Sequence, residues 1–380
     1  MIEVTHQDIF EIYQNFFIEK RRLLERKKIA IFGAGVRGMM LVMLLKKRGV
    51  SSVLFIDNDR EKQGKEIEGI RIYPLEYLED KTEEIIVLLS MERNQEAEAE
   101  LISFGYKKNE TFFILLEERY QKSYHDFQKK NSRLLLGDCI VDSILINEKE
   151  KVSLRLLLKE RYAEEISIIA EHGFYMRQYY YIMKNYINRN TLIKKIVILV
   201  SPEIFHSKYH LYPNAQHIKF MRCILHEKEY EQKEFLKELE ERDRGEWKLS
   251  FLPNRLAGRE HQENAKRVFT KLNYMYRVDI ENESFFYLKK AVELCKKRKI
   301  EFHVCVAPIN YSLAESLWGE EFRKSYSFIL QSIADTVGEE GFLNYSNLIE
   351  EHHFVSICSI NEAMDFAGRE KLAKNLEYYL

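Results

Sequence analysis

Residues 28–38 read Lys-Ile-Ala-Ile-Phe-Gly-Ala-Gly-Val-Arg-Gly, a short apolar run that ends in three spaced glycines. A helical pattern follows over residues 39–47, so this Gly-x-Gly-x-x-Gly motif lies where a strand turns into a helix. In such a motif Gly33 permits the tight turn, Gly35 lets a phosphate approach the backbone, and Gly38 lets the helix pack closely on the strand. The segment therefore predicts a nucleotide-binding βαβ unit.

An acidic cluster follows the next apolar run. Residues 53–56 are apolar and end at Asp57-Asn58-Asp59, and Asp57 comes 22 positions after Gly35, where a ribose hydroxyl needs an acceptor. The start of the helix offers free N–H groups and a partial positive charge to an anion. A glycine turn without any ligand is the alternative. The residues predicted to contact a nucleotide are Gly33, Gly35, Arg37, Gly38, Asp57 and Asp59.

Composition narrows the class of protein. The chain has 380 residues, enough for two domains, with 46% hydrophobic and 31% charged residues and a net charge of −1, which argues against nucleic acid as a partner. It holds no apolar run of about 18 residues, so we expect no transmembrane segment. The five cysteines show no Cys-x-x-Cys spacing, and His206 and His210 lack a third ligand. We therefore expect a cytoplasmic protein with neither disulfides nor a metal.

Hydrophobic patterns divide the chain into four parts. Residues 1–27 are expected to form an amphipathic helix with a basic end, which packs on its neighbouring domain, lies on a membrane surface or joins copies of the chain in a homo-oligomer. Residues 28–117 alternate strand and helix signals, which is typical of a parallel sheet covered by helices. Residues 118–131 predict a linker helix, and a second α/β domain is expected over residues 132–380.

The first of these domains carries further motifs. After Ile56-Asp57-Asn58-Asp59 come Lys62-x-Gly64, Gly69-Ile70-x-Ile72 and Pro74-Leu75. Together they resemble the small Rossmann-like domain at the N-terminus of bacterial sugar acetyltransferases that act on nucleotide-linked amino sugars. The resemblance covers roughly residues 27–118. It implies a nucleotide or nucleotide-sugar ligand, NAD or a UDP-sugar, without requiring reductase chemistry.

The second domain begins with an apolar run that leads into Gly137-Asp138-Cys139. With Ser201-Pro202-x-x-Phe205 and Ala307-Pro308-x-Asn310, this pattern resembles the SGNH or GDSL hydrolases, most nearly the D-alanine-transfer proteins of teichoic-acid synthesis. The resemblance implies a three-layer α/β/α domain of flavodoxin-like type that acts on a carbohydrate. The catalytic positions it implies are Asp138, Cys139, Gly173, Asn310, Glu362 and Asp365.

Two departures from the SGNH pattern affect its chemistry. Cys139 stands where the family has its nucleophilic serine, and Asp365 stands where it has the basic histidine, with Glu362 as the orienting acid. A carboxylate beside a thiol opposes formation of the thiolate, so Cys139 and Asp365 are a poor couple. His172, His352 and His353 are candidate bases, although a histidine in such a position is more often a packed or surface residue than a base. We expect a formed pocket with weak or no esterase activity.

Three functions remain open at this point. The first is a glycan-modifying enzyme in which nucleotide-sugar binding is coupled to an SGNH-like acyltransferase or esterase. The second is an SGNH-like scaffold that has lost its catalytic base and recognises a carbohydrate or a protein. The third is a nicotinamide oxidoreductase, which the sequence favours least because no second domain with hydride-transfer chemistry is evident.

Overall fold

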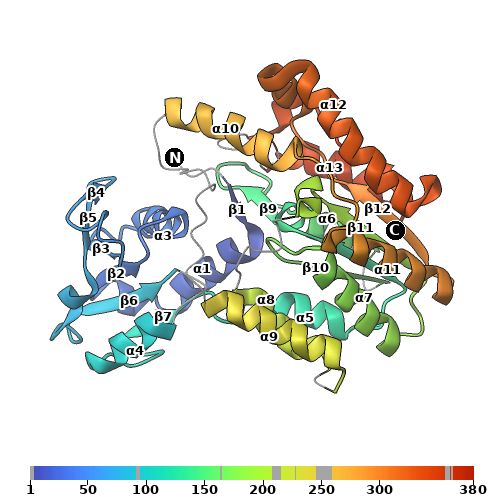
Figure 1. The fold of residues 1–380 in the computed structure, drawn as a ribbon. Helices are drawn as coiled ribbons and strands as arrows, with labels where there is room; N and C mark the ends of the chain where they lie inside the picture. The colour runs from blue at the N-terminus through green and yellow to red at the C-terminus, as the bar shows by residue number, and fades with distance from the viewer. Residues whose placement is uncertain are drawn as a thin grey trace. The chain divides into compact units, whose positions relative to one another are not determined.

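The structure, a computed structural model, describes residues 4–90, 95–162, 165–207, 215–226, 228–244, 259–355, 360 and 363–380. The fold is mixed α/β with parallel sheets (Figure 1). Two compact units are distinguished. Asp8–Arg119 form the smaller one, and Tyr120–Leu380 form the larger one together with the N-terminal strand β1, Val4–His6.

The smaller unit is built on one sheet with the strand order β4-β5-β3-β2-β6-β7. All neighbours are parallel except β4 and β5, which are antiparallel. If β2, β3, β5, β6 and β7 are counted along the chain, their spatial order is 3-2-1-4-5. The strands are β2 Lys28–Phe32, β3 Val53–Ile56, β4 Glu66–Ile67, β5 Ile70–Tyr73, β6 Ile85–Leu89 and β7 Phe112–Ile114.

The helices of this unit follow the predicted alternation with three differences. The segment predicted as one N-terminal helix over residues 1–27 begins as the strand β1, where the β-branched Val4 and Thr5 favour extended backbone. Residues 60–64, where the sequence predicts a short helix, form a turn in the structure, and β4 was not predicted. The helices are α1 Gln7–Glu19, α2 Arg21–Leu24, α3 Val36–Lys46 and α4 Gln95–Ser103.

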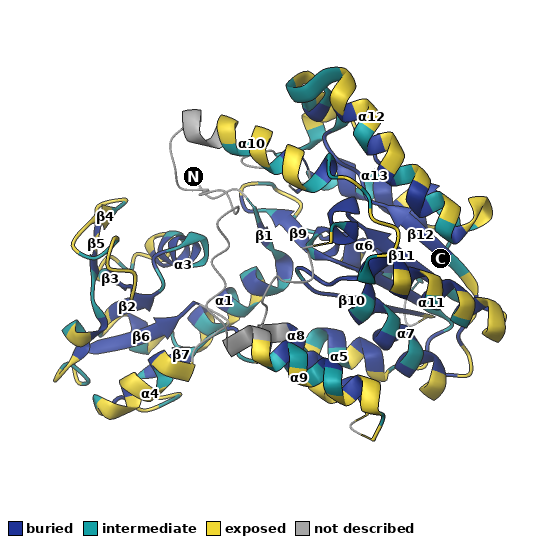
Figure 2. Cartoon of the chain, viewed as in Figure 1, coloured by how far each residue is buried: buried dark blue, intermediate teal, exposed yellow. Residues whose placement is uncertain are grey.

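The larger unit holds a five-stranded, fully parallel sheet with the order β10-β8-β11-β12-β13. Counted along the chain, this order is 2-1-3-4-5. Each strand is a nearly continuous apolar run because both faces of the sheet are covered (Figure 2). The strands are β8 Arg133–Gly137, β10 Ile166–Ala170, β11 Lys195–Val200, β12 Glu301–Val306 and β13 Phe342–Asn344.

Two apolar clusters cover the two faces of this sheet. Alternate residues of β11, such as Ile196 and Ile198, pack on one face with helices that include α7 and α11, whereas Val197 and Leu199 pack on the other with α6 and α13. Gly319 interrupts α12 with a φ of 55°, so this helix is bent. The helices are α5 Gln121–Gln128, α6 Leu154–Tyr162, α7 Met176–Arg189, α8 Ala215–Ile224, α9 Tyr230–Arg244, α10 Arg259–Tyr274, α11 Glu283–Arg298, α12 Tyr311–Val337 and α13 Phe366–Leu376.

A short second sheet completes the larger unit. β1 pairs antiparallel with β9, Ser143–Leu145, so that His6 lies opposite Ser143. This pairing brings the beginning of the chain to the loop that follows β8. Among the described residues, none of the helices combines the length and the apolar character required to cross a membrane.

Candidate functional site

The glycine loop of the smaller unit has the backbone that its motif predicts. Gly33 has a φ of 103°, a left-handed conformation that favours glycine. A side chain at Gly38 would place its Cβ 2.0 Å from the carbonyl oxygen of Gly33, so only glycine fits where α3 approaches β2. Gly35 is the N-cap of α3, and nothing lies within 4 Å of the position of its missing Cβ. Arg37 follows in the first turn of the same helix.

Asp57, which the spacing predicts as a ribose acceptor, has three hydrogen-bond donors around its carboxylate. One carboxylate oxygen accepts from the backbone N–H of Ala34 at 2.9 Å and from Lys62 Nζ at 3.1 Å, and the other accepts from the backbone N–H of Asp59 at 2.9 Å. The carboxylate therefore ties the glycine loop to the end of β3. Asp59 has a half-exposed side chain and also lies 3.7 Å from Lys62 Nζ, so it is the more accessible acceptor of the two.

The larger unit gathers its candidate residues at the carboxyl ends of the parallel strands. Such ends are where open α/β sheets bind ligands. A small hollow opens there between the loops that follow β8, β11 and β12. Its volume of about 10 Å³ is close to the space that one water molecule needs. It is lined by Asp138, Cys139, Ile140, Ser201, Ala307, Pro308 and Ile309.

Strand register brings His172 to Cys139. In the pairing of β10 with β8, Ala170 lies opposite Gly137. Cys139 comes two residues after Gly137 and His172 two residues after Ala170, so both leave the sheet at the same level. The carbonyl oxygen of His172 lies 2.9 Å from Nε2 of His217, a buried residue of α8.

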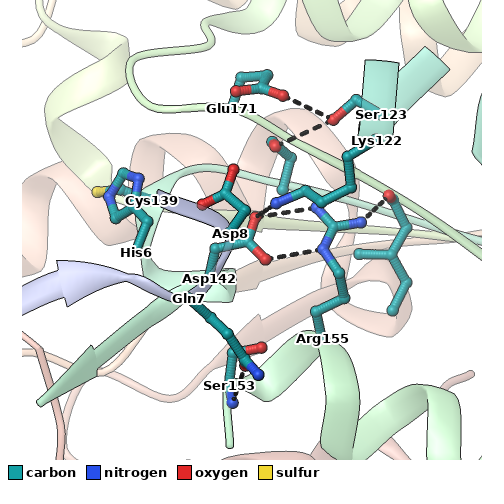
Figure 3. Close-up of polar contacts among 12 residues, drawn as sticks. His6, Gln7, Asp8, Lys122, Ser123, Cys139, Asp142, Ser153, Arg155 and Glu171 are labelled. Carbon is teal, nitrogen blue, oxygen red and sulfur yellow. Dashed lines mark hydrogen bonds and ion pairs between the residues drawn. The ribbon is translucent and has the colours of Figure 1, made fainter. Parts of the chain in front are cut away.

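The N-terminal strand adds a second histidine, His6. The Cys139 sulfur, one nitrogen of His6 and one nitrogen of His172 all lie within 4.8 Å of one another, and the three residues are partly buried. The two imidazole rings are 6.1 Å apart between centroids and inclined by 49°. Figure 3 shows the ring of His6 beside the Cys139 sulfur. The side chains of His6, Cys139 and His172 thus bring one thiol and two imidazoles together, donor atoms that could bind one metal ion.

Backbone bonds and a buried ion network hold this N-terminal strand. The N–H of Gln7 donates to the carbonyl of Asp142 at 2.8 Å, and the Gln7 side-chain oxygen accepts from the N–H of Ser153 at 2.8 Å. The Asp142 carboxylate in turn binds Arg155 through two hydrogen bonds of 2.8 and 3.0 Å and Lys122 at 2.7 Å (Figure 3). These contacts set the backbone position of His6 beside the turn that carries Cys139.

The same buried network stands behind His172. Arg155 also lies 3.3 Å from Asp126, and the neighbouring carboxylates raise the pKa of its guanidinium despite burial, which alone would lower it. Glu171, adjacent to His172 in sequence, is buried and accepts from Ser123 Oγ at 2.9 Å. Charged groups that are paired with one another inside the protein therefore lie next to the cluster of His6, Cys139 and His172.

Asp138 has a structural position next to the thiol. Its carboxylate accepts from the backbone N–H of Ile140 at 3.0 Å and caps the short helical turn Cys139–Val141. A side chain at Gly137 would bring a Cβ to 2.5 Å from Val141, so this turn requires the glycine before it. Burial raises the pKa of Asp138 to about 6, against backbone hydrogen bonds from Ile140 and Ser201 that favour the charged form.

Tyr179, which sequence reasoning did not single out, also faces this region. Its side chain is fully buried in α7, and its hydroxyl has no hydrogen-bond partner in the described part of the chain. Burial raises its pKa well above the usual value, and the nearby charges of Asp138 and Cys139 raise it further. Burying a hydroxyl without a hydrogen-bond partner costs free energy.

The other predicted catalytic residues have other partners. Gly173 follows His172 with a φ of 81°. Asn310 is buried and follows Ile309, which lines the hollow. It caps α12 by accepting from the N–H of Leu313 at 3.0 Å. Asp365 caps α13, and its carboxylate lies 2.9 Å from Nδ1 of His353. Asp365 is therefore paired with a histidine, and Glu362 lies outside the described residues.

Sequence reasoning named His172 but missed His6 as a partner of Cys139. His6 and Cys139 are 133 positions apart in the sequence, and the pairing of β1 with β9 brings them together. His206 lies against Tyr276, with 4.9 Å between ring centroids, and His210 lies outside the described residues. The one signal in the sequence was the pair Val4-Thr5 before His6, which favours a strand.

Comparison with known proteins gives one match. A protein family described as C2185-like, N-terminal, matches residues 25–112, which run from just before β2 to the beginning of β7. No curated protein and no solved structure matches the chain.

Proposed function

We propose that the larger unit is an SGNH-like acyltransferase or esterase that acts on a sugar and uses Cys139 as its nucleophile. The observation that carries this proposal is the thiol of Cys139 with a nitrogen of His6 and a nitrogen of His172, all within 4.8 Å of one another. Nucleophilic catalysis requires a base near the nucleophile, and an imidazole is the usual partner of a thiol. His6 and His172 take the place of the histidine that the sequence lacks at Asp365.

The architecture supports this assignment. The strand order 2-1-3-4-5 is that of flavodoxin-like sheets, and Cys139 follows the first strand at its carboxyl end, where such sheets bind their ligands. The sugar as substrate rests on the resemblance of both parts of the chain to enzymes of surface-glycan metabolism. The smaller unit, with its order 3-2-1-4-5 and its open glycine loop, suits a nucleotide or nucleotide-linked sugar.

The chemistry would proceed in two steps. An imidazole takes the thiol proton, and the Cys139 sulfur attacks the ester carbonyl of an acylated donor. The C–O bond to the leaving alcohol breaks, and that alcohol takes the proton back from the imidazolium, leaving a thioester on Cys139. In the second step an imidazole deprotonates a sugar hydroxyl or water, which displaces the thiolate. Transfer to a sugar makes the protein a transferase, and transfer to water makes it an esterase.

Hydrolysis of p-nitrophenyl acetate tests the thiol. We expect measurable turnover by the wild type and background rates for Cys139→Ala, because the alanine variant has no nucleophile. Replacing the base should cost about 10²–10⁴-fold in rate, so His6→Ala and His172→Ala identify which ring serves. Cys223→Ala is the matched control, since this exposed thiol lies on α8. Equal rates for wild type and Cys139→Ala would refute thiol catalysis.

The nucleotide proposal has its own test, a thermal-shift screen with NAD, UDP, CDP and UDP-sugars at millimolar concentration. A ligand that binds only the folded state raises the unfolding temperature. We expect a shift with at least one nucleotide and its loss in Gly35→Val, where the new side chain fills the open space above the loop. If no nucleotide shifts the transition, the smaller unit has a structural role.

A second candidate function is an SGNH-like scaffold without catalytic activity. The observation that favours it is the hollow beside Cys139, whose volume of about 10 Å³ leaves room for about one water and not for a sugar. Under this alternative the larger unit recognises a carbohydrate or a protein on its surface. Background esterase rates in the wild type, together with a folded Cys139→Ala variant of unchanged stability, would favour the scaffold.

A further inference from the structure

We propose that His6, Cys139 and His172 bind Zn²⁺, and that the bound ion holds the Cys139 sulfur out of acyl transfer. The inference of a zinc site depends on the geometry alone, whereas the inhibitory effect of the bound zinc rests on the proposed function. The cluster would then be a switch between a metal-bound, inactive thiolate and a metal-free nucleophile.

The donor atoms select the class of metal. One thiolate and two imidazole nitrogens are borderline-soft ligands that suit zinc, while magnesium and calcium require oxygen ligands. Three protein ligands leave the fourth tetrahedral position for water or a substrate group, as in zinc sites that stay open. The chain supplies the three from different segments, β1, the turn after β8 and the loop after β10.

The distances are close to those that a tetrahedral ion needs. Zinc–nitrogen and zinc–sulfur bonds of about 2.0–2.3 Å place neighbouring ligand atoms about 3.3–3.8 Å apart. The three atoms here lie within 4.8 Å of one another, so they need to approach by about 1–1.5 Å at most. Rotation of the imidazole rings and of the cysteine side chain supplies a movement of this size, while the backbone positions stay set by strand pairing.

Metal binding and acyl transfer exclude each other at this sulfur. The thiolate is both the metal ligand and the nucleophile, so a zinc–sulfur bond occupies the electron pair that would attack a carbonyl. Binding releases the thiol proton to solvent, and both imidazoles bind through neutral nitrogens. The ion also removes both candidate bases, His6 and His172, from general-base catalysis.

Direct binding measurements test the site independently of any activity. Apoprotein prepared with a chelator is titrated with Zn²⁺ in competition with a chromophoric chelator, and with Co²⁺ followed by absorption. We expect one equivalent to bind and the cobalt complex to show a sulfur-to-cobalt charge-transfer band. His6→Ala, His172→Ala and Cys139→Ser should each weaken Zn²⁺ binding by at least about tenfold, since each loses a ligand. Cys139→Ser should also lose the charge-transfer band.

Two exposed residues of the larger unit provide matched controls. His125→Ala removes a histidine of α5 and Cys223→Ala removes a thiol of α8, and neither should change affinity or spectrum. Circular dichroism of each variant confirms that it is folded. Wild-type affinity in folded Cys139→Ser and His6→Ala variants, or no cobalt–sulfur band in the wild type, would overturn the zinc site.

The activity readout separates the two proposals. If zinc binds and added chelator raises esterase turnover, both the site and its inhibitory role are supported. If zinc binds but the metal-free protein has no activity that depends on Cys139, the proposed acyl transfer fails while the metal site stands. If turnover requires the bound metal, the inhibitory role is overturned.

Discussion

Asp138 makes the stability of the folded protein depend on pH, and this dependence can be measured. Its carboxyl group lies inside the larger unit, where burial raises its pKa from the ordinary 3.8 to about 6. The folded protein therefore keeps this proton to a higher pH than the unfolded chain does. Folding becomes less favourable as pH rises from about 4 to about 6, because the folded state binds more protons than the unfolded state in that range.

The size of the effect follows from the shift. The pKa moves by about two pH units, and each corresponds to about 1.4 kcal/mol, so ionised Asp138 lowers the free energy of unfolding by about 3 kcal/mol above pH 6. Asn keeps the shape and the oxygen that accepts from Ile140, and it carries no charge. We therefore expect Asp138→Asn to gain stability relative to the wild type as pH rises, with little further gain above pH 7.

Urea denaturation of both proteins between pH 4 and pH 8 measures this difference, because other titrating groups contribute equally to both curves. Tryptophan fluorescence reports on the larger unit, since both tryptophans of the chain follow residue 119. Asp279→Asn is the control, an exposed aspartate that accepts from the N–H of Glu281 in a similar turn. Parallel profiles for the wild type and Asp138→Asn would refute a buried, proton-holding carboxyl.

Two further substitutions test packing and charge. Gly38→Ala should destabilise the smaller unit by at least about 1–3 kcal/mol, because the new Cβ would lie 2.0 Å from a backbone oxygen. The control Gly35→Ala should cost only a few tenths of a kcal/mol, since nothing lies within 4 Å of its Cβ position. Hydrogen exchange of peptides over β2 and α3 measures both costs, and equal costs would contradict the packing argument. Arg155→Ala should lower the free energy of unfolding of the larger unit by about 3–5 kcal/mol, because Asp142 and Asp126 then lose a buried partner. The control Arg161→Ala, at a more exposed ion pair, should cost less than about 1 kcal/mol. Urea denaturation measures both losses, and equal losses would show that the buried network is unimportant.

Regular elements were predictable where the apolar pattern was strong. Residues 195–200 and 301–306 form the strands β11 and β12, because continuous runs of β-branched and apolar residues suit a sheet covered on both faces. Short edge strands were missed. β9 and β13 have three residues each, too few for a periodic signal, and β1 is a strand only through its pairing with β9. Tertiary contacts decide such segments.

The site was predictable to the extent that local motifs define it. The turn after Gly137 and the loop after Ala170 each follow a strong strand, so their meeting follows from parallel order. For Asp57 the spacing predicts a ribose contact, which stays a prediction, but the spacing does not predict the hydrogen bonds that its oxygens accept from Ala34, Asp59 and Lys62. The pairing of Asp365 with His353 also arises from folding, because a distance of 12 positions along the chain carries no signal for a side-chain contact.

The two histidines beside Cys139 depend on different parts of the fold. His172 reaches the thiol through the pairing of β8 with β10, two strands inside the main sheet, so it is in place whenever that sheet is formed. His6 reaches it through a three-residue strand held by Gln7 and by the backbone of Asp142. The proposed thiol–imidazole pair of Cys139 and His172 therefore requires only the main sheet, whereas the proposed three-ligand zinc site also requires the pairing of β1 with β9.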